Sequence, residues 1–119
     1  MLNGRRDLKQ ILKKIYHHES LAGVDLRNLY LSSMDLSGLD LRRADLDGCC
    51  LTHACLDDCD LRDAHLANAN LSHASVNRAQ MTGAILTNVV ADGASFESVI
   101  GLTAAGRKYL QSRGAKGLC

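Results

Sequence analysis

The sequence contains no proline and no tryptophan, and its 119 residues include only four aromatic side chains, Tyr16, Tyr30, Phe96 and Tyr109. A core built from this chain must therefore consist of aliphatic residues, alanine, methionine and cysteine. No apolar run approaches the roughly 20 residues that cross a bilayer, and the N-terminus lacks the apolar stretch of a secretory signal. We therefore expect one small domain in the cytoplasm, without membrane association.

The net charge is only +1, but the charged residues are unevenly distributed along the chain. Residues 1–20 hold five basic and two acidic side chains, and residues 102–119 hold four basic side chains and no acidic one. The stretch between them holds five arginines and eleven acidic residues. Because basic residues concentrate at the two ends and aromatic residues for base stacking are scarce, we do not expect direct binding of nucleic acid.

A five-residue period is the dominant pattern of the sequence. Sixteen consecutive positions at this spacing are apolar, and the first eleven are all leucine. We expect the core to be formed by Leu26, Leu31, Leu36, Leu41, Leu46, Leu51, Leu56, Leu61, Leu66, Leu71, Val76, Met81, Leu86 and Phe96, with Leu21 and Ala91 in the same row. From Leu26 onward, the residue two places before each of these is also apolar and usually small, as in Ala44, Cys49 and Ala54.

A period of five fits neither an α-helix, with its period of 3.6, nor a flat strand, with its period of 2. Two inward positions in every five residues fit a chain that runs briefly extended and then turns a corner. Large leucines would fill the centre of each side, whereas the residue close to the corner must be small. Stacked coils would then pair their backbones, and no proline removes a donor from that ladder. The pattern therefore predicts an all-β solenoid.

The motif Ala-Asp/Asn-Leu recurs at this spacing, as in Ala44-Asp45-Leu46 and Ala69-Asn70-Leu71. In this the chain resembles the pentapeptide-repeat family, whose pattern is A(D/N)LXX, over residues 21–100. The resemblance implies a right-handed quadrilateral β-helix of about four coils with a non-enzymatic role. Val24, Leu29 and Met34 stand where alanine is usual, so we expect a wider first coil.

Both ends of a solenoid need polar-faced caps, because a stack of coils leaves a bare apolar face and unpaired strand edges. We expect an N-terminal cap over residues 1–20, with an amphipathic helix over 5–18 carrying Leu8, Ile11, Leu12 and Ile15 on one stripe. The alternative is a basic helix that binds a membrane or an acidic partner. Residues 21–101 would form the β-helix, and residues 102–119 a helix beginning after Thr103, followed by a loose tail.

Two outward-facing groups are candidate partner surfaces. The first is Arg42, Arg43 and Arg62, because residues twenty apart lie above one another and stacked like charges are costly; alternatively, Asp40, Asp60 or Asp63 neutralises them. The second is Ile85, Val90 and Ile100, which either form a homodimer or partner surface or are covered by the C-terminal helix. From these groups we predict a protein-interaction module that presents a rigid surface to an unidentified protein.

The alternative function is mimicry of DNA, through which some members of the resembled family bind a type II topoisomerase such as gyrase. That function needs a rod with exposed negative charge. Asp25, Asp35, Asp40, Asp45 and Asp60, however, precede the central leucines, where their carboxylates are expected to bond turn amides. The remaining acidic residues between positions 21 and 101 nearly balance the five arginines, so we rank this alternative second.

Metal binding and catalysis have little support in the sequence. Cys49, Cys50, Cys55, Cys59 and Cys119 are an odd number and are expected to be free thiols. A zinc site would need four converging ligands, whereas the repeat register turns Cys49 and Cys59 inward. Cys50 and His53, joined by Cys55 or His73, would be the best remaining group. No nucleophile stands beside a positioned base, so we expect neither catalytic residues nor a cofactor.

Overall fold

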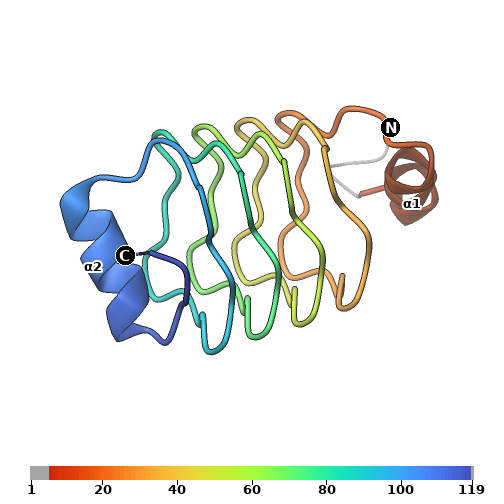
Figure 1. The fold of residues 1–119 in the computed structure, drawn as a ribbon. Helices are drawn as coiled ribbons and strands as arrows, with labels where there is room; N and C mark the ends of the chain where they lie inside the picture. The colour runs from red at the N-terminus through yellow and green to blue at the C-terminus, as the bar shows by residue number, and fades with distance from the viewer. Residues whose placement is uncertain (1–5, 119) are drawn as a thin grey trace.

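The computed structural model describes residues 6–118, and the predictions that concern Arg5 and Cys119 lie outside the described residues. Residues 21–100 form four stacked coils, with helix α1 (Leu8–Tyr16) at one end and helix α2 (Ala104–Ser112) at the other (Figure 1). We name these coil 1 (residues 21–40), coil 2 (41–60), coil 3 (61–80) and coil 4 (81–100). The molecule is a rod with extents of 47 × 24 × 21 Å.

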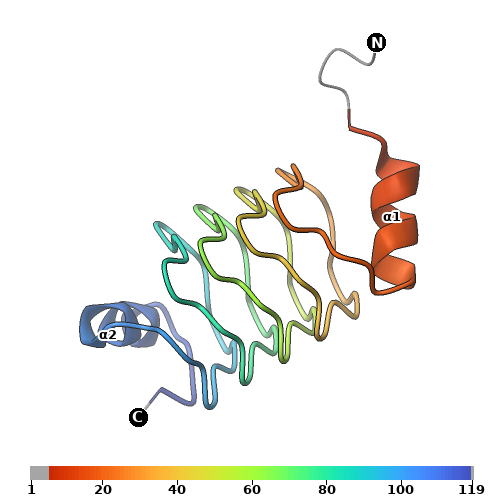
Figure 2. The same ribbon diagram turned by 90° about the horizontal axis from the view of Figure 1, so that it is seen from above.

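The coils are held together by parallel backbone bridges between residues that are twenty positions apart. One column joins Asp25, Asp45, His65 and Ile85, and each of the other three sides carries an equivalent column. Each side is too short for a regular strand, so each pairing is an isolated bridge. Seen from above, the coils lie as successive layers along the rod (Figure 2). Residues five apart therefore occupy successive sides, and residues twenty apart occupy the same side.

The corners are built by a repeated turn with a left-handed residue. All sixteen positions from residue 23 to residue 98 at five-residue spacing have φ between 56° and 76°. In one such turn the N–H of Ala44 donates to the carbonyl of Leu41 at 3.1 Å, with Arg43 in the left-handed position, as in a type II turn. Eleven of these sixteen residues are not glycine. The hydrogen bonds between coils therefore hold these residues in a left-handed backbone conformation that residues other than glycine rarely adopt.

The core is the predicted leucine column, with one exception. Thirteen of the fourteen expected core residues are buried, together with the small corner residues from Ala44 to Ala79. Leu86 is only partly buried, which corrects the prediction for that residue. The physical reason is that no complete coil follows coil 4, so one face of Leu86 has no covering layer. At the other end, Val24, Leu29 and Met34 are also partly buried.

Helix α1 lies against coil 1 with only half of its apolar stripe. Asp7 caps the helix by accepting the N–H of Gln10 at 3.2 Å. Ile11 and Ile15 are buried in the core, whereas Leu8 and Leu12 are 50% and 48% exposed. The helix thus closes the end of the rod and also leaves an apolar flank open to solvent. Neither described helix has the length and apolar character needed to cross a membrane.

Helix α2 replaces the first half of a fifth coil. Thr103 caps it by accepting the N–H of Gly106 at 3.0 Å, and Leu110 is fully buried. The chain then returns to the ladder. Lys116 bridges Ser95, and Leu118 is buried at 4% exposure. The expected loose tail over residues 114–119 is therefore wrong for residues 114–118, because these residues pair with coil 4 and contribute a side chain to the core.

Candidate interaction surfaces

The arginine side of the rod is neutralised by aspartates of the same turns. Arg42 binds the Asp40 carboxylate through Nε and Nη2, both at 2.8 Å. Arg62 binds Asp60 in the same way, at 2.8 and 2.6 Å. The guanidinium of Arg42 holds the pKa of Asp40 well below its usual range. Arg43 is exposed at its left-handed position and forms no ion pair with a residue of the described range.

The aspartates that precede the central leucines cap their own turns, as the sequence predicted. The Oδ1 atoms of Asp25, Asp35, Asp40, Asp45 and Asp60 each accept the N–H two residues later, at 3.0 to 3.2 Å. Asn70 accepts the N–H of Ser72 in the same geometry at 3.0 Å. Four of these aspartates, Asp25, Asp40, Asp45 and Asp60, are also ion-paired to arginine. Their charge is therefore largely balanced at the surface of the rod.

Two further columns follow the twenty-residue register. Arg78 binds Asp58 of the coil below through Nε at 3.0 Å and Nη2 at 3.2 Å. The rings of His53 and His73 stack with centroids 5.1 Å apart and planes inclined by 17°. Within residues 6–118, no three His, Cys, Asp or Glu side chains are grouped so that they could hold a metal ion.

The four described cysteines are free thiols in two different environments. Cys49 and Cys59 are buried, donate to the carbonyls of Leu26 and Leu36, and have pKa values raised by burial to about 11 and about 12. Cys50 is partly exposed, and its contact with the Ser32 hydroxyl lowers its pKa. Burial raises the pKa of Cys55. The sequence could not separate Cys50 from Cys55, because both precede a central leucine.

The large apolar side chains that remain exposed lie at the two ends of the rod. In the described chain they are Leu8, Leu12, Tyr16 and Tyr30 near α1, and Ile85 and Ile100 in coil 4. Coils 2 and 3 expose none of this size. The sequence singled out Ile85 and Ile100, but it missed Tyr30, whose position before a central leucine is usually polar in this chain.

The predicted apolar group of Ile85, Val90 and Ile100 does not form one continuous patch. Ile85 pairs with His65, Val90 with Asn70 and Ile100 with Gln80, and each pair belongs to a different column of bridges. The three residues therefore lie on three different sides of coil 4. Helix α2 does not cover Ile85 and Ile100, which are 41% and 59% exposed. Val90 is half-buried and lines a cleft with Ser112 and Arg113. These residues surround the end of the rod rather than mark one face of it.

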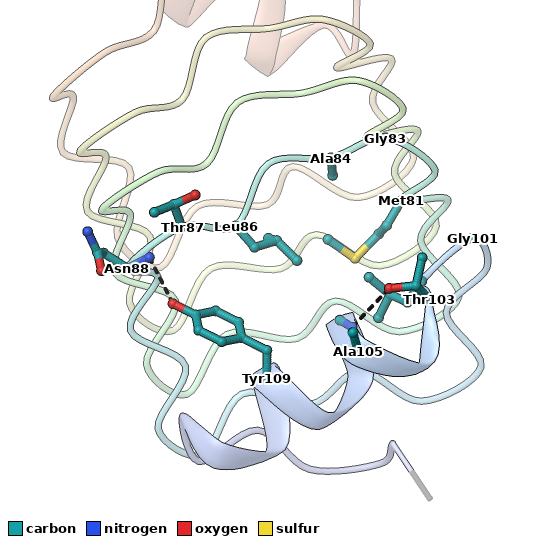
Figure 3. A pocket seen from close by; sticks show the side chains of 12 residues that line it. Met81, Gly83, Ala84, Leu86, Thr87, Asn88, Gly101, Thr103, Ala105 and Tyr109 are labelled. Atoms are coloured by element: carbon teal, nitrogen blue, oxygen red, sulfur yellow. Dashed lines mark hydrogen bonds between the residues drawn. The ribbon is translucent and has the colours of Figure 1, made fainter.

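Clefts lie at both ends, where the helices meet the outermost coils. The larger one, about 590 Å³, lies between coil 4 and α2 and is lined by Met81, Ala84, Leu86, Leu102 and Tyr109 among others (Figure 3). Two others, about 530 and 270 Å³, lie beside α1 and share Leu12 as a lining residue. The two ends therefore combine exposed apolar side chains with concave surface.

Three solved structures of pentapeptide repeat proteins are similar to this chain, and the first of them shares its fold. A pentapeptide repeat protein from Nostoc Pcc 7120 is 22% identical, with 92% of this chain and 95% of that chain covered and a TM-score of 0.76. A pentapeptide repeat protein of the Arabidopsis thaliana thylakoid lumen is 23% identical over 97% and 89% of the two chains, with a TM-score of 0.46. HetL of Nostoc sp. Strain PCC 7120 is 28% identical over 80% and 47%, with a TM-score of 0.42.

No protein with a curated description matches this chain significantly. The family model for pentapeptide repeats matches residues 20–63 and 64–100, which together form the whole stack of coils. The fold is accordingly a right-handed quadrilateral β-helix. From this match, and from the four-sided stack itself, the chain belongs to the pentapeptide-repeat family.

Proposed function

We propose that this protein is a non-enzymatic interaction module, which binds a protein partner through the ends of a rigid rod. The observation that carries the proposal is the distribution of exposed apolar residues. Leu8, Leu12, Tyr16 and Tyr30 lie at one end and Ile85 and Ile100 at the other, whereas the described side chains of coils 2 and 3 expose no large apolar group. Exposed apolar side chains that are confined to the two ends of the rod, beside the clefts there, are typical of binding sites.

The rigidity of the rod supports the same function. Backbone bonds join every coil to the next, and the buried leucines fill the axis. A surface held in this way loses little conformational freedom on binding, and that loss is a main cost of association. The charged sides contribute less to the proposal, because exposed ion pairs such as Arg42–Asp40 are worth only about 0–1 kcal/mol.

The alternative, a mimic of DNA that acts on a type II topoisomerase, has weaker support. The carboxylates of Asp25, Asp40 and Asp60 accept hydrogen bonds from neighbouring arginines and turn amides, so they present little unpaired negative charge. A rod with a longest extent of 47 Å, caps included, corresponds to about 14 base pairs at 3.4 Å each. A gyrase supercoiling assay tests this alternative directly. Inhibition or protection at micromolar protein would favour mimicry over the proposed interaction module.

The test of the proposed function is affinity capture with matched variants, followed by binding measurements on the purified partner. Tyr30→Asp and Ile100→Asp place a charge on the exposed apolar ends, and His53→Asp serves as a control on an exposed position of coil 2. We expect an end variant to weaken binding of the partner by about tenfold or more, about 1.4 kcal/mol. Equal binding by all variants would contradict the proposal, and loss with Arg42→Glu/Arg62→Glu alone would move the site to the charged side.

A further inference from the structure

The edge of coil 4 leaves backbone groups without partners. In coil 3, the N–H groups of Asp63 and Leu66 donate to coil 4 at 2.9 and 2.8 Å, and the carbonyl of Ala64 accepts the N–H of Ile85 at 2.9 Å. The equivalent groups of coil 4 are the N–H of Gly83, the N–H of Leu86 and the carbonyl of Ala84. None of these three has a hydrogen-bond partner among residues 6–118. They are left over because the chain forms α2 instead of the next side.

Side chains from α2 and its C-terminal end take the place of the missing backbone hydrogen bonds only on the next side of coil 4, at residues 88 and 89. The Tyr109 hydroxyl accepts the N–H of Asn88 at 2.8 Å, and Arg113 Nε donates to the carbonyl of Val89 at 3.0 Å. Leu110 fills the core beside them. The edge at residues 83–86 receives no such side chain. The helix thus closes part of the cross-section and leaves one strand edge open.

The open edge and the cleft of about 590 Å³ are the same place. Gly83, Ala84 and Leu86 line the cleft, and Met81, Leu102 and Tyr109 contribute apolar side chains to its walls (Figure 3). An apolar cleft beside unpaired N–H and C=O groups is the arrangement that binds an extended peptide as an added strand. The backbone groups supply affinity, and the apolar walls select a side chain that points inward.

We propose that an extended peptide segment of a partner protein adds to the coil 4 edge at residues 83–86 and inserts a leucine-sized side chain between Leu86 and α2. The inference rests on the proposed interaction function and names its partner chemistry. A four-residue strand spans about 13 Å at 3.3 Å per residue, which matches the open part of one side. Because Leu110 covers the adjoining core, the cleft accepts a single chain segment and not another complete coil.

The charge of the α2 segment favours an acidic peptide. No charged residue lines the cleft itself, and residues 102–113, which form its α2 side, carry Arg107, Lys108 and Arg113 and no acidic residue. The N-terminus of α2 also borders the cleft through Thr103, Ala105 and Gly106, and a helix N-terminus favours negative charge. Asp63 lies close to Gly83, which lines the cleft on the side of the coils. The acidic residues of the peptide therefore belong on the α2 side, and the apolar residue belongs above the coil.

The experiment uses the full chain and a fluorescent ten-residue peptide in which Ala-Asp-Leu-Asp-Asp occurs twice. Binding is followed by fluorescence anisotropy. Three altered peptides carry an N-methylated amide at the aspartate before each leucine, asparagine in place of leucine, or lysine in place of aspartate. We expect saturable binding of the first peptide and a loss of about tenfold or more with each altered peptide, equivalent to about 1.4 kcal/mol. N-methylation at this aspartate removes the N–H that would donate to the carbonyl of Ala84, as the N–H of Ile85 donates to the carbonyl of Ala64, and it leaves every side chain unchanged. It therefore distinguishes an added strand from a nonspecific apolar contact.

A matched pair of protein variants locates the site. Ala105→Trp fills the cleft from α2, whereas Ala104→Trp places the same side chain on the neighbouring exposed position outside the lining residues. Ala105→Trp should weaken peptide binding about tenfold, and Ala104→Trp should leave it within about twofold. No binding, equal binding of the N-methylated peptide, or equal effects of the two tryptophans would each overturn the inference. A partner that still responds to Tyr30→Asp would then show that the interaction function survives without this site.

Discussion

The hydroxyl of Tyr109 accepts the backbone N–H of Asn88 at 2.8 Å, and one coil below the N–H of Asn68 donates to the carbonyl of Thr87 at the same distance. A side chain of α2 thus takes the place that a backbone carbonyl holds elsewhere in the ladder. Arg113 does the same for the carbonyl of Val89. The cap is therefore bound to the rod by hydrogen bonds as well as by the burial of Leu110.

Replacement of Tyr109 by phenylalanine should remove one of these bonds. We expect Tyr109→Phe to lower the free energy of unfolding by about 1 kcal/mol, the usual net worth of a hydrogen bond. Tyr30→Phe is the control, because Tyr30 is 87% exposed and its hydroxyl has no partner in the described range. Urea denaturation followed by circular dichroism measures both. A loss of equal size in the two variants would contradict the role given to the Tyr109 hydroxyl.

Leu66 and Leu86 occupy the same column one coil apart, but only Leu66 is covered on both sides. Leu66 is 1% exposed, whereas Leu86 is partly buried beside the cleft. Leu66→Ala should cost about 2–5 kcal/mol, as other buried leucines do, and Leu86→Ala at least about 1 kcal/mol less. Denaturant midpoints compare the two variants. A larger loss at Leu86 than at Leu66 would show that the cleft is closed in solution.

The return of the chain to coil 4 leads to a third prediction about stability. Leu118 is 4% exposed, so Leu118→Ala should lower the free energy of unfolding by about 2 kcal/mol or more. Lys116 pairs through its backbone and has an exposed side chain, so Lys116→Ala should change stability by no more than about 0.5 kcal/mol. Thermal unfolding of the two variants measures the difference. An unchanged midpoint for Leu118→Ala would mean that residues 114–118 do not belong to the core.

The aspartate–arginine pairs predict a loss of stability in acid. The hydrogen bond from Arg27 lowers the pKa of Asp25 to about 2, and Arg42 and Arg62 lower the pKa values of Asp40 and Asp60. A carboxylate whose pKa is depressed in the folded protein stabilises the fold at pH values above its pKa in the unfolded chain, about 3.9. This contribution is lost as the pH falls through the pKa of the folded state. The melting temperature should therefore decrease as the pH falls below about 4.

The variant that tests this origin replaces Asp25, Asp40 and Asp60 by asparagine. Asn70 already caps its turn through Oδ1 in this chain, so the turns should persist. The triple variant should lose less stability than the natural sequence between pH 5 and pH 2. Parallel curves for the two proteins would assign the acid sensitivity to other groups.

The cysteines should react with a thiol reagent in a fixed order. In a Cys119→Ser background, Cys50 should react first, because its pKa is lowered and its side chain is partly exposed. Cys55 should follow more slowly, because its pKa is raised. Cys49 and Cys59 should react only after unfolding, since both are buried in the core. Mass spectrometry of peptides taken at successive times gives the order, and early labelling of Cys59 would contradict its inward position.

The five-residue period determined most of the rod. Leu41 and Leu61 lie in one column because every fifth residue turns inward and four sides close a coil, and the same register stacks His53 on His73. It also placed Asp40 and Asp60 on their turn amides. These features depend on contacts between residues close in sequence or one coil apart. A local repeat is therefore enough to predict them.

The tertiary structure alone decided how the repeat ends. The pairing of Ser95 with Lys116, the burial of Leu118 and the exposure of Leu86 depend on where α2 leaves the ladder and where the chain rejoins it. At the other end, α1 buries Ile11 and Ile15 and leaves Leu8 and Leu12 open, which the regular stripe did not indicate. Each result is set by the fit of a helix to the end of a stack. No periodic pattern within the repeats records that fit.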